Sequence, residues 1–191
     1  FQKGGQALTV ITLTNRDPNS TGGSRFTNAV GINYTKQTLV NSTNFIWAIF
    51  QQTVDADKKQ YTALNAFAQI TFSLIPETLK QSSLESYFMR QLMFGNSSTP
   101  GGLIEGIADY VRLKAGYVVS NWAKNDQGTL WDESYSVTAR FLDYCNGLRN
   151  RFVAELNKKM RSGYSNNFLV ELLGKTPEQL FVDYKAKYNS A

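Results

Sequence analysis

The chain has 191 residues, a length that fits one domain with a buried core, and its 42% hydrophobic content is typical of a globular protein. A formal net charge of +5 is too small to indicate a nucleic-acid partner. The sequence contains no histidine and one cysteine. This composition excludes Ser-His and Cys-His catalysis, histidine-ligated metal sites, intrachain disulfides and thiolate zinc clusters.

The first half of the chain is expected to contain both strands and helices. The β-branched run at 6–14 predicts a strand, and the stretch 15–24 consists of turn-forming residues. Apolar residues recur at helical spacing over 25–52, which predicts one long helix or two consecutive helices. A second strand is predicted at 65–75, followed by a helix at 77–94.

The second half is expected to be mostly helical. A helix at 103–115 precedes a polar and aromatic connection over 116–135, and the clearest helical period covers 136–160. Two cap signals mark the remaining boundaries: Gly174 after a short helix at 166–173, and Thr176-Pro177-Glu178-Gln179 before a last helix. The balance of elements predicts a single α+β domain over residues 1–191.

Two further features concern the location of the protein. No run of about 18 apolar residues occurs, so neither a transmembrane helix nor a membrane partner is expected. Four N-x-S/T triplets can accept N-glycans, although a chain rich in Asn, Ser and Thr also yields such triplets by chance. They begin at Asn19, Asn33, Asn41 and Asn96. These triplets favour a secreted glycoprotein.

The segment 103–112 contains the first chemically informative pattern. Glu105 and Asp109 are four residues apart, so a helix places them on one face beside Arg112. Like charges at this spacing destabilise a helix by a few tenths of a kcal/mol on a surface, and by more when buried. One interpretation is a solvated face neutralised by Arg112 and other cations. The other is a carboxylate pair retained for chemistry.

Long motifs in the chain resemble the plant basic secretory proteins. The motifs are TPGGLIEGIADYVRLKAGY, WDESYSVTARFLDYCNGLRNRFVAELNKKMRSGY, KQTLVNSTNFIWAIFQQ and LLGKTPEQLFVDYKAKY. This resemblance covers most of the chain and implies a zincin-like fold, in which a small twisted sheet accompanies long helices and a helical C-terminal half. It also implies secretion from a plant cell to the apoplast or the vacuole.

The resemblance further implies a zinc peptidase, whose His-Glu-x-x-His helix is followed by a Glu-x-x-x-Asp helix. In that pattern Glu105 falls at the third zinc ligand and Asp109 at the carboxylate that orients a ligand histidine. The histidine segment falls on 86–90, or on 85–89 in a shifted register, and neither contains a histidine. In the first register Tyr87 stands at the general-base glutamate. Zinc-dependent peptide hydrolysis is therefore not expected, and no metal or other cofactor is assigned.

Loss of the metal leaves carboxylates without a compensating charge, and two hypotheses follow. In the first, Arg90 replaces the charge of the metal and pairs with Glu105, which gives an inert scaffold. In the second, Glu105 or Asp109 lies in a partly apolar cleft with a raised pKa and acts as a general acid or base, with Tyr87 and Tyr135 as further catalytic candidates. The candidate substrate-binding residues are Phe88, Arg90, Tyr110, Arg112, Trp131 and Arg140.

Two functions then compete, both with a small molecule as the expected partner. The first is a metal-independent enzyme of plant specialised metabolism that performs an addition, elimination, cyclisation or condensation. The second is a catalytically inactive secreted pseudopeptidase that acts as a binding or defence protein. A third arrangement, an all-carboxylate site of Glu85, Glu105 and Asp109, suits Mg or Mn better than zinc. Cys145 lies on the apolar face of its helix and is expected to be a buried structural thiol.

Overall fold

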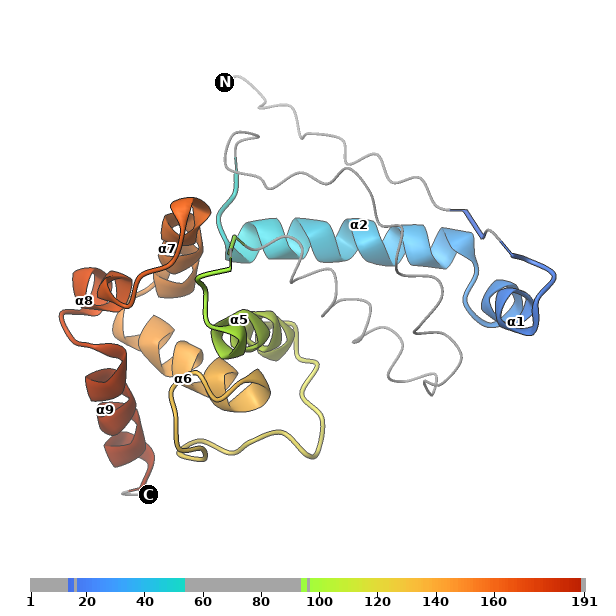
Figure 1. The fold of residues 1–191 in the computed structure, drawn as a ribbon. Coiled ribbons are helices and arrows are strands. Elements are labelled where there is room, and N and C mark those ends of the chain that lie inside the picture. Colours follow the sequence, from blue (N-terminus) through green and yellow to red (C-terminus); the bar gives the residue numbers. More distant parts are fainter. Residues whose placement is uncertain (1–13, 16, 54–93, 96, 190–191) are drawn as a thin grey trace, which may run out of the picture.

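The computed structural model describes residues 14, 15, 17–53, 94, 95 and 97–189. A short helix α1 and a long helix α2 come first, and a group of shorter helices, α5 to α9, follows (Figure 1). Their bounds are α1 Thr21–Ala29, α2 Ile32–Ile49, α5 Gly101–Lys114, α6 Tyr135–Leu148, α7 Phe152–Lys159, the 3-10 helix η2 Met160–Ser162, α8 Asn167–Leu173 and α9 Pro177–Asn189.

The predicted α+β class with a twisted sheet is wrong, because every regular element within the described ranges is a helix and no strand occurs there. The predicted strand at 65–75 and the predicted helix at 77–94 lie outside the described residues, apart from Phe94, which is not helical. Of the predicted strand at 6–14, only Thr14 is described, and it is not in a strand. Strand preference depends on neighbouring strands, so a β-branched run alone was weak evidence for a sheet.

The stretch predicted as one or two helices over 25–52 forms two. Helix α1 begins directly after Ser20, whose Oγ accepts a hydrogen bond from Gly23 N at 3.0 Å. The two helices are separated at Gly31, whose φ of +76° lies in the left-handed region that favours glycine. The turn predicted over 15–24 therefore ends at Ser20, four residues earlier than expected.

Helices α5 and α6 pack closely because two glycines on α5 leave room for the α6 segment. A Cβ on Gly106 would lie 2.2 Å from Thr138 Cγ2, and a Cβ on Gly102 would lie 1.7 Å from the carbonyl oxygen of Asp132. These positions are four residues apart, so they share one face of α5. Gly102 and Gly106 thus have a packing role in this fold.

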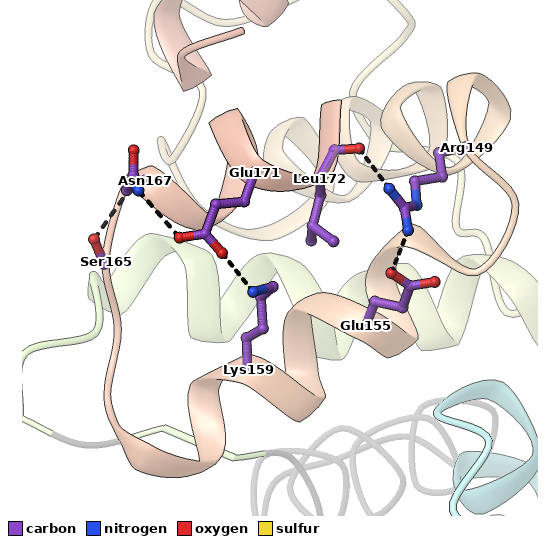
Figure 2. Close-up of polar contacts among 7 residues, drawn as sticks. All are labelled: Arg149, Glu155, Lys159, Ser165, Asn167, Glu171 and Leu172. Carbon is purple, nitrogen blue, oxygen red and sulfur yellow. Dashed lines mark hydrogen bonds and ion pairs between the residues drawn. The ribbon is translucent and has the colours of Figure 1, made fainter. Parts of the chain in front are cut away.

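The region predicted as one helix over 136–160 is interrupted. Helix α6 ends at Leu148, and Arg151 adopts a left-handed conformation with φ +71° before α7 begins at Phe152. Polar contacts then hold α7 against α8 (Figure 2): Lys159 Nζ donates to Glu171 Oε2 at 2.5 Å.

The core of the described region joins α2 to the C-terminal helices. Phe141 of α6 contacts the rings of Phe181 and Tyr184 of α9, with centroids 5.5 and 6.0 Å apart. The Tyr184 hydroxyl also accepts from Asp126 N at 3.1 Å, which fixes the connection between α5 and α6. The largest fully buried side chains are Tyr184, Phe141, Phe152, Ile46, Leu103, Ile107, Leu142, Leu156 and Met160.

Both predicted cap signals are confirmed. Gly174 ends α8 in a left-handed conformation, with φ +76°. Before α9, Thr176 N donates to Gln179 Oε1 at 3.0 Å and Gln179 N donates to Thr176 Oγ1 at 3.3 Å. This reciprocal pair satisfies two backbone donors at the start of the helix.

Candidate functional site

Helix α5 places Glu105 and Asp109 on one face, as their spacing predicts. Their surroundings differ, because Asp109 is only 5% exposed whereas Glu105 is half-buried. Apolar residues of the same helix, Leu103, Ile107 and Ala108, are fully buried around them. The two carboxylates therefore belong to a core helix rather than to a solvated face.

Asp109 is neutralised within its own helix. Arg112 Nη1 donates to Asp109 Oδ1 at 2.8 Å, and the two side chains are 15% and 7% exposed. The Arg112 guanidinium also lies over the Trp122 ring, 5.3 Å from its centroid. Arg112 therefore neutralises Asp109, as the first interpretation expects, but Asp109 is buried rather than solvated.

Two of the aromatic candidates are core residues. Tyr110 is 4% exposed, and burial, reinforced by the nearby Asp143 carboxylate, raises the pKa of its hydroxyl. Trp131 is 7% exposed and packs on Phe141 with ring centroids 6.3 Å apart. Both side chains are packed in the core, so neither is exposed to a ligand from solvent.

The remaining candidates are dispersed. Arg140 is half-buried, and its Nε donates to the carbonyl oxygen of Ala123 at 3.2 Å. Tyr135 begins α6 with a strained φ of +46° and is 58% exposed. Three other candidates lie outside the described part of the chain: Tyr87, Phe88 and Arg90. The proposed pairing of Arg90 with Glu105 therefore stays a prediction.

The two cavities described below are lined by residues other than the candidates named above. One, of about 230 Å³, lies between the end of α2 and α7, and its walls include Phe50, Gln52, Phe94 and Arg161. Another, of about 590 Å³, is lined by α6, α8 and their neighbours, including Leu172. Neither has a lining residue from α5. No sequence motif indicated either cavity.

The donor set does not fit the zinc ion that the resemblance implies. The chain has no histidine, which removes the nitrogen ligands. Cys145 is fully buried, and burial raises the pKa of its thiol, which keeps it protonated and unsuitable as a ligand. Among the described residues, no group of three His, Cys, Asp or Glu side chains is arranged to hold a metal. The expectation of a buried thiol is confirmed.

No helix in the described ranges is both long enough and apolar enough to cross a membrane.

Comparison with known proteins gives the class of the chain. A family model described as a peptidase of plants and bacteria matches residues 8–74 and 75–184. The chain therefore belongs to the basic secretory protease family.

One relative shows how far the likeness extends. A basic secretory protease of Boswellia serrata is 48% identical over 58 residues, which are 30% of this chain and 66% of the relative. No solved structure matches the chain.

Proposed function

We propose that the chain is a non-catalytic member of its peptidase family, a pseudopeptidase that binds a small organic ligand. The observation that carries this proposal is the Asp109–Arg112 pair, 2.8 Å apart in the core of α5. A buried carboxylate held by an adjacent guanidinium is stabilised in its charged form and is a poor proton-transfer group. The acid therefore has a structural role.

The other described candidates support this proposal. Tyr110 and Trp131 are packed into the core, and Arg140 is bonded to the backbone of a connecting segment. A catalytic site needs several groups directed at one substrate position. Here the side chains of Tyr110, Trp131 and Arg140 contact the protein itself, and the absence of histidine removes the zinc mechanism of the family.

We also propose that the protein is secreted and glycosylated. The side chains of Asn19, Asn33 and Asn41 are exposed, as N-glycosylation requires. Asn96 lies outside the described residues. The name of the Boswellia serrata relative, a secretory protease, supports the same location.

A metal-independent enzyme of plant specialised metabolism is the second candidate. The observation that favours it is the half-buried state of Glu105, which keeps the carboxylate partly accessible beside apolar residues of α5. A carboxylate that a ligand can reach is suited to general acid or base catalysis. In this candidate Glu105 transfers a proton during an addition, elimination, cyclisation or condensation.

Incubation of the purified protein with a plant metabolite extract tests the proposal. The extract contains a chelator, and untargeted mass spectrometry follows the metabolites with time. The non-catalytic proposal predicts the same metabolite profile with native and heat-denatured protein. A product that accumulates only with the native protein contradicts it and favours the enzyme.

A further inference from the structure

The cavity between the end of α2 and α7 has the features of a ligand site. Its volume is about 230 Å³. An apolar cavity of about 150 Å³ already holds benzene, so this one accommodates a small organic molecule. Its lining comes from the residues directly after α2, from Phe94 and from the region of α7 and η2.

The α7 side of the cavity is cationic. Ala154, Glu155 and Lys158 share one face of α7 by their spacing, Arg151 directly precedes the helix, and Arg161 follows in η2. Within the described part of the chain, none of these three cations forms an ion pair. Glu155 is the acid on this face, and it is neutralised by Arg149, which does not line the cavity. Arg149 Nη2 donates to Glu155 Oε2 at 2.7 Å (Figure 2). The cavity therefore has an excess of positive charge.

Two aromatic side chains, Phe50 and Phe94, form the apolar part of the cavity wall. Phe50 is 4% exposed, and Phe94 lies beneath the Arg161 guanidinium, 5.4 Å from its ring centroid. The backbone at Phe94 is held in place because its N–H donates to Asn157 Oδ1 at 2.8 Å. A ligand in this cavity meets an apolar wall and a cationic wall at the same time.

Gln52 supplies the most specific feature of the cavity. Its side chain lines the cavity and is 4% exposed, yet neither Nε2 nor Oε1 has a hydrogen-bond partner among the described residues. Burial of unsatisfied amide atoms is unfavourable in the absence of a ligand. The complementary ligand carries an N–H donor for Oε1 and an oxygen acceptor for Nε2.

We propose that this cavity binds an N-acylated α-amino acid with a free carboxylate and a small apolar side chain. Lys158 and Arg161 pair with the carboxylate, and Gln52 bonds to the amide group of the ligand. The side chain of the ligand packs on Phe50 and Phe94. The inference rests on the proposed function, since it gives the non-catalytic protein its ligand. The same chemistry is present in free N-acyl amino acids and at the carboxyl end of a peptide.

Three matched probes separate the contributions of charge and amide. The full chain is titrated with N-acetyl-L-leucine, with N-acetyl-L-leucinamide, which lacks the charge, and with 4-methylpentanoate, which lacks the amide group. Binding is followed by two-dimensional NMR of the labelled protein. N-acetyl-L-leucine is expected to bind about tenfold tighter than either control, the scale of one charge-assisted hydrogen bond. Equal affinities for the three probes, or no saturable binding of N-acetyl-L-leucine, overturn the proposal.

Variants then locate the binding site. Arg161→Gln is expected to weaken N-acetyl-L-leucine about tenfold, whereas Arg25→Gln, which removes an exposed arginine on α1, leaves the affinity unchanged. Gln52→Leu is expected to weaken binding while folding stability is retained or raised, because the variant removes two unsatisfied buried atoms. Unchanged affinity in both cavity variants overturns the assignment.

Two last measurements identify the source of the ligand and test the ligand site separately from the non-catalytic function. The tripeptide Ala-Ala-Leu binds as tightly as N-acetyl-L-leucine if the cavity accepts peptide carboxyl ends, and more weakly if it accepts free N-acyl amino acids. Mass spectrometry of the recovered probe detects turnover. Binding with turnover supports the site and contradicts the non-catalytic function, whereas no binding and no turnover contradicts the site alone.

Discussion

The residue Asp109 combines burial with a charge. The resemblance to zinc peptidases implies that this position orients a histidine ligand, but this chain contains no histidine. The charge of Asp109 is balanced instead by Arg112, one turn further along α5. A buried carboxylate with such a partner stabilises the fold only while both members of the pair are present.

Substitution Asp109→Asn is expected to lower the free energy of unfolding by about 3 kcal/mol, because it leaves the largely buried Arg112 guanidinium without its counter-charge. Urea denaturation of the purified variant measures the change. The matched control is Asp143→Asn, whose ion pair with Lys114 is 38% exposed on both sides and contributes about 1 kcal/mol or less. Equal losses in the two variants would contradict the structural role of Asp109.

Cys145 makes a second residue-scale prediction. Burial raises the folded-state pKa of its thiol above the unfolded value of about 8.5. The resulting stability is fully present below that value and is lost as pH rises, because only the unfolded thiol then ionises. Between about pH 8.5 and 9.5 the free energy of unfolding is expected to fall more steeply with pH for the unsubstituted protein than for the Cys145→Ala variant. Parallel pH profiles of the two proteins in urea denaturation would rule this out.

At the scale of elements, the contact between α5 and α6 depends on Gly106. Gly106→Ala is expected to destabilise the fold by about 2 kcal/mol, because the added Cβ would lie 2.2 Å from Thr138 Cγ2 and force the helices apart. Gly101→Ala on the same helix is the control, since nothing lies within 4 Å of its Cβ position. Thermal unfolding compares the two. Alanine has the higher helix propensity, so Gly101→Ala is expected to retain or raise stability, and a similar loss in both variants would contradict the packing role of Gly106.

The sequence predicted helices best where local chemistry determines their ends. Gly174 and the Thr176–Gln179 pair act within a few residues, so their caps were predictable. The interruption between α6 and α7 was not, because Arg151 is an ordinary residue whose left-handed conformation depends on packing around it. The two predicted strands lie outside the described residues, apart from Thr14, so these two predictions are not tested.

The candidate site was predictable only in part for the same reason. Helical spacing correctly placed Glu105 and Asp109 on one face. Spacing could not show that Asp109 is buried while Glu105 is only half-buried, which is a tertiary property. The cavity at Gln52 combines α2 with α7, about a hundred residues apart in the sequence, so no local pattern indicated it.

At the scale of the whole molecule, the proposal of a secreted glycoprotein predicts N-glycans on the surface. When the chain is expressed in plant leaves with a secretory leader, glycans are expected on Asn19, Asn33 and Asn41, which are exposed. Enzymatic glycan removal in heavy-oxygen water converts each occupied asparagine to labelled aspartate, which peptide mass spectrometry detects. Unmodified asparagine at all three positions in the secreted protein would contradict the proposal.

The central claim is that the α5 carboxylates no longer perform chemistry. The most direct measurement compares the native protein with Glu105→Gln in the same chelator-treated metabolite extract, by untargeted mass spectrometry. A non-catalytic binding protein predicts indistinguishable metabolite profiles for the two proteins, because Glu105 then transfers no proton. A product that forms with the native protein and is lost in the folded Glu105→Gln variant would contradict the claim and make Glu105 a catalytic residue.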